Sequence, residues 1–456
     1  MRHKFALLAV CFTLAAAMSQ SLFATNATVG YCAGPGTHYP NIQAAVNALE
    51  ALAGTRTVDV CPGIYTEQVT ITKSLTLQGI VGSGQNNAVI ASPAGGVAVN
   101  TSDLANAQPT AAQILVAPSS PTTAITVNIS DLAVDGSNNG LGPISACNTD
   151  LVGIYYQNAS GTINHVATRF QELPTAYFGC QDGLAIYVQS GYGTGGTATV
   201  TVENSSVHDY DKNGITADGS GTNATITGNY VVGIGATTLI AQNGIQLSVG
   251  AIGKISSNTV TDDVYINPSN CLVTIPWNGI NPECYSASGI LLYDSGGTSA
   301  TPVTVSSNTV SNTQGAIVTY TDGAETADYN SVTTNKVTTV PAIVGAETYT
   351  LDGIDLCSDN NTATSNTVLN ASGAGVHLDS SCTEPSSLPS GTGSAATNVV
   401  NEACAGVLTG SNGGTQTGTV ANNVVAVTAS GDSCPSGEDV ARRSGRPKVR
   451  PFHHER

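Results

Sequence analysis

Two carboxylates and one imidazole form the group of side chains in the sequence that is best suited to catalysis: Asp355, His377 and Asp379. Each lies two or four residues after a repeated Gly-apolar pair, Gly353-Ile354 or Gly375-Val376, so the two segments share one phase of a repeat and should face outward together. Hydrolysis of a glycosidic bond needs at least two carboxyl groups, held roughly 5 to 9.5 Å apart. We therefore interpret Asp355, Asp379 and His377 as candidate catalytic residues.

The same segment also fits a cation site. Asp352 and Asp359 are close in sequence and would add oxygen ligands of the kind that calcium prefers. Calcium is therefore the one cofactor to consider. Because the sequence contains no calcium-loop motif, its ligands are not fixed. Solvated turn residues are the alternative interpretation of all these side chains.

Tyrosines and carboxylates recur at other positions predicted to face outward. Tyr187, Asp218 and Tyr293 lie four residues after successive repeat glycines. Trp277, the single tryptophan, and Tyr285 lie in an excursion from the repeat. Because an aromatic ring can pack against the apolar face of a sugar while its polar tip stays in water, we interpret these five side chains as candidate substrate-binding residues. The alternative for Trp277 is that it only pins its own loop.

A further polar cluster, residues 208–212, places acid, base and cation types in five consecutive positions, His208-Asp209-Tyr210-Asp211-Lys212. Adjacent residues of a strand face opposite ways, so the cluster is not a preassembled site. We interpret it as a polar turn.

All these candidates depend on a repeat that runs through most of the chain. Asn213-Gly214-Ile215 returns one repeat later as Asn243-Gly244-Ile245, and an Asn-x-Val mark, Asn229-Tyr230-Val231, falls between them. The segments between such marks alternate small apolar residues with Thr, Ser and Asn, which predicts short strands joined by polar turns. A repeat this short cannot bury a core alone, so successive copies must stack into a solenoid.

The Gly-Ile and Asn-x-Val rungs resemble those of the pectin-lyase-like superfamily. The resemblance implies an all-β fold, a right-handed parallel β-helix solenoid, over nearly all of the mature chain. It also implies a ladder of stacked asparagines inside one turn, formed by Asn229, Asn258, Asn308, Asn335 and Asn366. These motifs specify a fold and no reaction. The Asp-Phe-Ile-Phe-Gly segment of pectin methylesterases and the Gly-His-Gly and Arg-Ile-Lys segments of polygalacturonases are missing.

The ends of the chain differ in composition from the repeats. Residues 1–24 combine basic residues with a short apolar run, which is typical of a secretory signal peptide. Residues 25–57 are expected to form an N-terminal cap segment, whose short capping helix carries an apolar stripe of Ile42, Ala45, Val46 and Leu49. Residues 58–437 are expected to form the parallel β-helix domain and residues 438–456 a basic disordered tail. No later segment has the ~20 apolar residues of a transmembrane span, so we expect a secreted protein, extracellular or at the cell surface.

Ten cysteines follow Cys11 of the signal peptide. An even number of cysteines in an exported chain favours disulfides over metal ligands. Most neighbouring cysteines are about one repeat apart, which would place them on adjacent coils at a separation that suits a disulfide. The expected pairs are Cys32 with Cys61, Cys147 with Cys180, Cys271 with Cys284, Cys357 with Cys382, and Cys404 with Cys434.

The formal net charge of −17 is distributed unevenly. Six of the 14 Lys and Arg residues follow Val440 and two lie in the signal peptide, which leaves six for the repeats. So few cations argue against nucleic acid as a partner, because phosphate binding draws on many Lys and Arg contacts.

We therefore expect a monomer that binds polysaccharide along an outward face. If the protein is an enzyme, it is a glycoside hydrolase or a polysaccharide lyase. The alternative is a non-catalytic surface or matrix protein with a structural or adhesive role.

Overall fold

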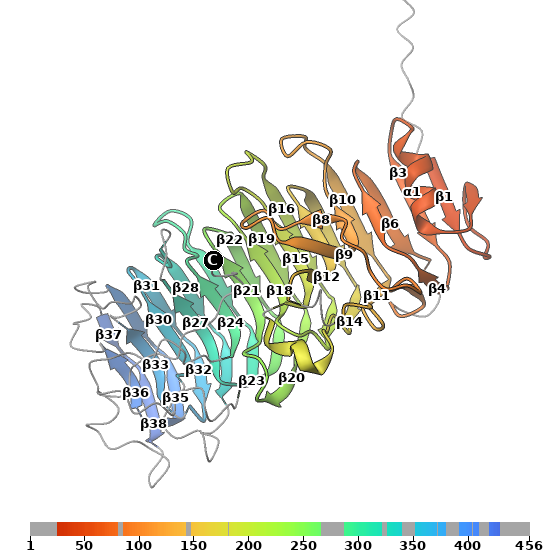
Figure 1. Cartoon of the computed structure of the whole chain (residues 1–456). Coiled ribbons are helices and arrows are strands. Elements are labelled where there is room, and N and C mark those ends of the chain that lie inside the picture. The colour runs from red at the N-terminus through yellow and green to blue at the C-terminus, as the bar shows by residue number, and fades with distance from the viewer. Residues whose placement is uncertain are drawn as a thin grey trace, which may run out of the picture.

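The computed structural model describes residues 25–80, 85–142, 147–180, 182–265, 287–321, 326–339, 352–371, 373–379, 392–403, 405–409 and 419–428. Within these ranges the strands form three long sheets that run the length of an elongated rod (Figure 1). Most coils of the chain contribute one strand to each sheet in turn, and neighbouring strands pair in parallel. The fold is the right-handed parallel β-helix that the resemblance implies.

The three sheets are named A, B and C, and their strands are given in spatial order. Sheet A contains β2 (Thr37–Tyr39), β1 (Thr25–Val29), β3 (Arg56–Val60), β6 (Leu75–Gly79), β10 (Thr126–Ser130), β13 (Ser160–Asn164), β16 (Ala198–Glu203), β19 (Thr222–Thr227), β22 (Ile252–Ser256), β25 (Val303–Ser306), β28 (Asn330–Thr333), β31 (Asn361–Thr364), β34 (Gly393–Ala396) and β37 (Thr419–Ala421). Sheet B contains β38 (Val424–Thr428), β35 (Val399–Ala403), β32 (Thr367–Leu369), β29 (Lys336–Thr339), β26 (Thr309–Thr313), β23 (Thr259–Tyr265), β20 (Tyr230–Thr237), β17 (Ser206–His208), β14 (Ala167–Arg169), β11 (Ala133–Asp135), β7 (Ala88–Ala91) and β4 (Gly63–Thr66).

Sheet C contains β36 (Ala405–Thr409), β33 (Ala374–Asp379), β30 (Ile354–Cys357), β27 (Gly315–Tyr320), β24 (Ser288–Tyr293), β21 (Asn243–Ser248), β18 (Asn213–Asp218), β15 (Leu184–Gln189), β12 (Asp150–Gln157), β9 (Pro109–Val116) and β5 (Val69–Ile71). Strand β8 (Thr101–Ser102) pairs with β9 and is antiparallel to it. A single turn of 3-10 helix, η1, spans Thr175–Cys180.

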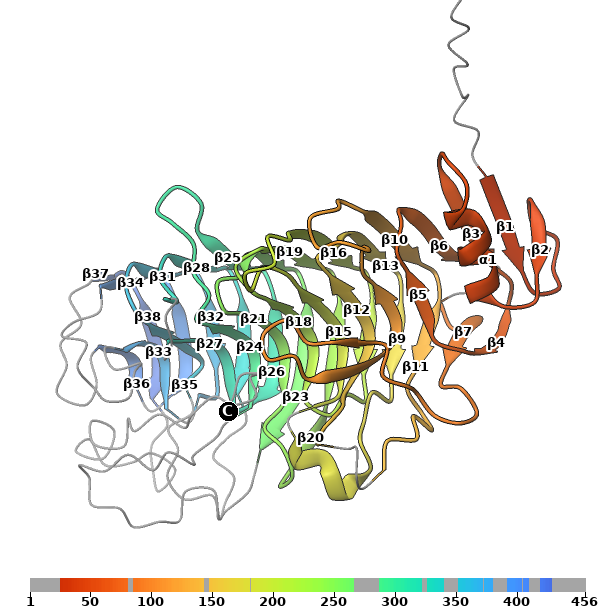
Figure 2. The same ribbon diagram turned by 45° about the horizontal axis from the view of Figure 1, so that its top comes forward.

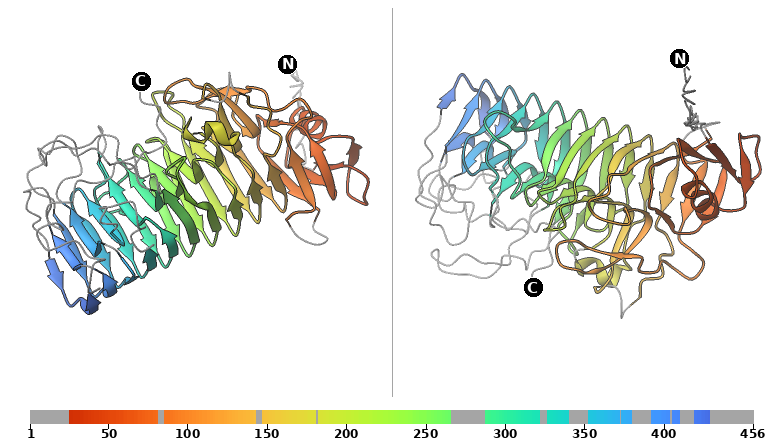
Figure 3. Two further views of the ribbon diagram at one scale, coloured as in Figure 1. Left: turned by 60° about the horizontal axis from the view of Figure 1, so that its bottom comes forward. Right: turned by 90° about the horizontal axis from the view of Figure 1, so that it is seen from above.

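A ladder of isoleucines lines the core side of sheet C. Each side chain is fully buried and opposes another isoleucine on a neighbouring strand. The members are Ile114, Ile154, Ile186, Ile215, Ile245, Ile290, Ile317 and Ile354. Burying one such side chain contributes about 1.5–3 kcal/mol, and no coil achieves this burial without its neighbours. The regular stacking of coils is visible along the rod in Figure 3.

The asparagine ladder is confirmed at all five predicted positions. Asn258 accepts hydrogen bonds at Oδ1 from the backbone N and the Nδ2 of Asn229, at 2.9 and 3.0 Å, while Asn229 Nδ2 also donates to Val202 O. Asn258, Asn308, Asn335 and Asn366 repeat this pattern with the coil that follows each. The structure extends the ladder to Asn398 and Asn423. The side chains thus satisfy backbone groups that the turn would otherwise leave unpaired.

A short helix covers the N-terminal end of the rod, as predicted. Helix α1 spans Ile42–Glu50 and buries the expected apolar stripe. Asn41 caps it, because Asn41 Oδ1 accepts a hydrogen bond from Ala44 N at 2.8 Å. The carboxylate of Glu67 accepts from the backbone N of both Ile42 and Gln43, so the helix start is bound to the first coil.

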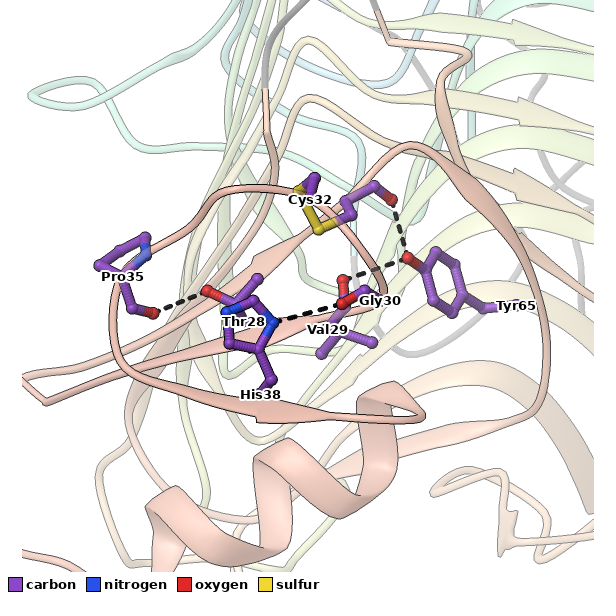
Figure 4. The surroundings of a disulfide bond; sticks show 8 residues. Thr28, Val29, Gly30, Cys32, Pro35, His38 and Tyr65 are labelled. Carbon is purple, nitrogen blue, oxygen red and sulfur yellow. Dashed lines mark hydrogen bonds between the residues drawn. A yellow bond between two sulfur atoms is a disulfide. The ribbon is translucent and has the colours of Figure 1, made fainter.

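Two of the five expected disulfides lie within the described residues and both are confirmed. Cys32 pairs with Cys61 and Cys147 with Cys180, with Cα atoms 5.7 and 5.0 Å apart. Around the first, Tyr65 Oη lies 2.9 Å from Cys61 O and 3.2 Å from Val29 O, which links it to β1 (Figure 4).

Cys357 is also disulfide-bonded. Its expected partner Cys382 lies outside the described residues, as do Cys271, Cys284, Cys404 and Cys434, the signal peptide of residues 1–24 and the basic tail of residues 438–456. Among the described residues, no helix has both the length and the apolar composition to cross a membrane.

The asparagine ladder generates a stability prediction. Replacing Asn308 with alanine leaves the donors of Asn258 and the carbonyl of Ile255 without their partners. We expect the free energy of unfolding, measured in urea, to fall by about 2–3 kcal/mol because buried polar groups lose their hydrogen bonds. Asn128, which is exposed on the outward face of β10, is the matched control, and Asn128→Ala should change stability by less than about 0.5 kcal/mol. Equal losses in the two variants would contradict the role of the ladder.

Candidate functional site

The outward side of sheet C carries the candidate catalytic residues. Strands β30 and β33 pair so that Asp355 lies directly opposite His377, and Cys357 lies opposite Asp379. The repeat phase inferred from sequence therefore places Asp355 and His377 as cross-strand neighbours. Asp379 ends β33, two residues beyond His377.

A third residue, Asp352, completes the group. His377 Nδ1 lies 2.8 Å from Asp352 Oδ2 and 3.8 Å from Asp355 Oδ1. The other oxygen of Asp352, Oδ1, accepts a hydrogen bond from Ala374 N at 2.6 Å, which ties the residue to the start of β33. The side chains of His377, Asp352 and Asp355 are 4%, 10% and 13% exposed.

This geometry selects one tautomer of the imidazole. An ionised carboxylate can only accept hydrogen bonds, so the close contact with Asp352 places a proton on Nδ1 of His377. The other ring nitrogen, Nε2, then carries the lone pair that can accept a proton. A histidine oriented by a carboxylate in this way is suited to general acid–base chemistry.

The same three side chains form a candidate cation site. One ligand atom from each of Asp352, Asp355 and His377 lies within 4.8 Å of the others. Two carboxylates and one imidazole suit a transition metal better than calcium, which takes six to eight oxygen ligands. Asp359 is not part of this group, because its Oδ1 accepts hydrogen bonds from the N and Oγ1 of Thr392.

Tyr187 and Asp218 point away from the core, as their phase predicts, but neither is open to solvent. Each is 1% exposed. The β8–β9 hairpin lies across this part of sheet C (Figure 2), and its Asp103 accepts hydrogen bonds from Tyr187 Oη at 2.9 Å and Gln189 Nε2 at 3.0 Å. Tyr187 and Gln189 also contact Asp218 Oδ2, both at 3.1 Å.

The covered tyrosines act as neutral hydrogen-bond donors. Tyr155 and Tyr187 stack with ring centroids 4.8 Å apart. Burial, and then the nearby carboxylates of Asp103 and Asp218, raise the pKa of both phenols well above the ordinary value. This patch therefore fastens the hairpin to the rod in the present structure.

The remaining candidate substrate-binding residues are separated from that patch along the chain. Tyr293 is 6% exposed and stacks on Tyr320 at 5.7 Å, beside Leu291 and Val318. Trp277 and Tyr285 lie outside the described residues. The structure thus brings Asp355 and His377 together, but it joins neither of them to Tyr187 or Asp218.

The polar turn expected at residues 208–212 is buried in its second half. Tyr210, Asp211 and Lys212 are 0% exposed. Tyr210 Oη donates to Asp263 Oδ1 at 2.6 Å, and Lys212 Nζ donates to Ala241 O at 2.5 Å. Sequence reasoning missed this interior cluster because its contacts join residues 29 or more positions apart.

Three aspartates of this region are held away from water. Burial is the main cause that raises the pKa of Asp182, Asp211 and Asp263 well above the ordinary value. For Asp211 the neighbouring charges of Asp182 and Glu172 add to the increase, and the charge of Lys212 opposes it. The cluster is therefore part of the interior and is not an open binding site.

Comparisons with known proteins match at the level of structure only. No protein-family model and no curated protein sequence matches the chain. A mannuronan C-5 epimerase A-module from Azotobacter vinelandii aligns at a TM-score of 0.42 and 11% identity, over 85% of this chain and 91% of its own. A DFA-IIIase from Arthrobacter chlorophenolicus A6 aligns at 0.46 and 15%, over 89% and 86%. A lacto-N-biosidase from Eubacterium ramulus aligns at 0.49 and 11%, over 88% and 68%. At these TM-scores the likenesses carry no argument about activity.

The buried aspartates generate a prediction of pH dependence. Because the folded-state pKa of Asp211 is raised, the folded protein binds more protons than the unfolded chain above the unfolded pKa of about 3.9. Stability must therefore fall as pH rises from that value towards the raised folded pKa. Asp211→Asn should match the wild type near pH 3 in urea unfolding and exceed it at pH 8, by about 1.4 kcal/mol for each pKa unit of the shift.

Asp209, whose side chain is 38% exposed, provides the control. Asp209→Asn removes an exposed carboxylate and should not reproduce the gain in stability of Asp211→Asn at pH 8. A wild-type stability that rises between pH 5 and pH 8, or an Asp211→Asn variant with an unchanged slope, would contradict the assignment.

Proposed function

We propose that this protein is an exported polysaccharide-binding β-helix that cleaves its glycan at the Asp352, Asp355 and His377 group. The observation that carries the proposal is the 2.8 Å contact between His377 Nδ1 and Asp352, next to the carboxylate of Asp355. Disulfides in the described part of the chain fit an oxidising compartment outside the cytosol.

In this proposal His377 is the general acid–base, and Asp352 is a positioning residue that holds the imidazole. Asp355 and Asp379 keep the catalytic roles expected from the sequence, as the carboxyl pair. His377 Nε2 accepts a proton from water, the water oxygen attacks the anomeric carbon, the glycosidic C–O bond breaks, and a carboxyl group protonates the departing oxygen. Trp277 and Tyr285 are proposed as contacts to the glycan.

We prefer hydrolysis to elimination because the protein has few cationic side chains. A uronate lyase must stabilise negative charge that develops at the substrate carboxylate, and it does so with cations. The repeat region has only six Lys and Arg residues. A neutral glycan is therefore the better match to this protein.

A non-catalytic surface or matrix protein is the second candidate function. The observation that favours it is the low exposure of the group, in which His377 is only 3% exposed. Under this alternative, the contacts of His377 with Asp352 and Asp355 simply join neighbouring strands. His377→Asn would then lower stability without changing any turnover.

The deciding experiment measures product release from a panel of neutral and acidic polysaccharides, with calcium and with a chelator. We expect new reducing ends without the ultraviolet absorbance of unsaturated products. His377→Asn should lower the rate by about 10²–10⁴-fold, as loss of a general acid–base does. Asp352→Asn should lower it less and shift its pH profile.

His165 provides a matched control, because its Nδ1 contacts Asp131 Oδ1 at 2.7 Å in a similar pair. His165→Asn should keep full activity. Unchanged turnover in His377→Asn would remove this residue from the mechanism. No product from any polysaccharide, from folded protein, would favour the non-catalytic alternative.

A further inference from the structure

A second surface feature lies on sheet A, away from the His377 group. A groove of about 480 Å³ follows the side of the rod where the chain enters β28, β31 and β34. One wall comes from Thr298 and Ser299 in the loop between β24 and β25, which stands out beside β25 in Figure 2. The groove crosses several coils and so runs along the rod.

Every residue that lines this groove is uncharged. Its floor includes a column of hydroxyl side chains that oppose one another on successive strands, Ser331, Thr362, Ser394 and Thr419. Each hydroxyl can donate one hydrogen bond and accept two. The column thus offers the same polar group at intervals of about 4.8 Å, the separation of neighbouring strands.

Two carboxylates of described residues next to the lining in sequence, Asp328 and Asp359, accept hydrogen bonds within the turns of the chain. Asp328 Oδ1 accepts hydrogen bonds from Ser358 Oγ and from Asp359 N. Asp359 Oδ1 accepts from the N and Oγ1 of Thr392, at 2.7 and 3.1 Å. Neither acid belongs to the lining, which offers no cation to bind an acidic ligand.

Tyr329 supplies the single aromatic ring of the lining. Its φ of 54° is in the left-handed region, where a large side chain is unusual. The equivalent residue one coil later is Asn360, with φ 59°, a type that tolerates this conformation well. A strained tyrosine at a position where the next coil uses asparagine points to a function for the ring rather than for the turn.

Asn330 adds a polar group that is not satisfied by the fold. It is 1% exposed, and its Nδ2 donates to Ala327 O at 2.6 Å. Its Oδ1 receives no hydrogen bond from any residue in the described part of the chain. On the next coil, by contrast, Asn361 Oδ1 accepts from Asn330 N at 2.7 Å. The side chain of Asn330 nevertheless has the inward phase of Val332, so this acceptor lies beneath the groove and is not part of its exposed lining.

We propose that this groove binds a neutral glycan chain extended along the rod. Tyr329 packs against the apolar face of one sugar, and the hydroxyl column binds the hydroxyl groups of that sugar and its neighbours. The coil spacing is close to the length that one pyranose adds to an extended chain. The ligand class is that of the proposed function, but binding here requires no chemistry at His377.

Affinity electrophoresis tests this directly, in gels that contain galactomannan, xyloglucan, mixed-linkage β-glucan, alginate or polygalacturonate. At least one neutral glycan should retard the wild type, and the acidic glycans should not. Tyr329→Asn should weaken that retardation at least five-fold in the dissociation constant. This variant adopts the residue of the next coil, so its melting temperature should equal or exceed that of the wild type.

Two further variants separate the groove from the general surface. Tyr230, a 52% exposed tyrosine on β20, is the control for ring loss, and Tyr230→Asn should bind like the wild type. Thr362→Val, which keeps side-chain shape but removes a hydroxyl, should weaken binding. Thr225→Val, in the same column on β19 but outside the groove, should not.

The proposal is overturned if the wild type binds none of the neutral glycans or binds only acidic ones. It is also overturned if Tyr329→Asn and the wild type bind the neutral glycan with the same dissociation constant. His377→Asn should retain full groove binding. Loss of turnover with binding intact supports both proposals together. Groove binding without turnover in the wild type would reject only the enzymatic function, and turnover without groove binding would reject only the groove.

Discussion

In-register stacking of parallel coils is the constraint on which the structure depends. No coil has an interior of its own, so each apolar residue becomes buried only when the coils before and after it place equivalent residues at the same position. The isoleucine ladder of sheet C and the asparagine ladder of the turn satisfy this condition in two ways. The first removes apolar surface from water, and the second satisfies backbone groups at a corner where no sheet partner exists.

Outward positions escape that constraint, and the chemistry of the molecule is concentrated there. On sheet C, Asp355 and His377 occupy positions that hold Leu291 and Val318 on earlier strands. On sheet A the same freedom gives a column of hydroxyl groups. The interior cluster at Asp211 and Lys212 is the exception, because it places charges where the fold rewards apolar groups, and burial shifts the acid towards its neutral form.

The parts of the fold that follow the repeat could be predicted from the sequence. The Gly-apolar and Asn-x-Val marks repeat often enough to predict the coils and five of the ladder asparagines. Helical periodicity predicts the apolar stripe of α1, and cysteine spacing predicts the Cys32–Cys61 and Cys147–Cys180 pairs. The hairpin over Tyr187 could not be predicted, because Asp103 comes from a segment without the repeat and lies 84 residues from its partner. Asp352 was not assigned to a catalytic role because its contact with His377 depends on how the chain enters β30. Burial of Tyr210, Asp211 and Lys212 was missed because local polarity does not reveal what later coils place above them.

The N-terminal end of the rod has consequences for how the molecule comes apart. In a solenoid each coil contacts only its neighbours, so order is lost most easily by successive release of coils from a free end. At the N-terminus, α1 covers the core, Glu67 holds the start of the helix, and a disulfide joins Cys32 to Cys61. Under mechanical load the disulfide therefore prevents the first coils from extending, and extension by pulling must begin elsewhere along the rod.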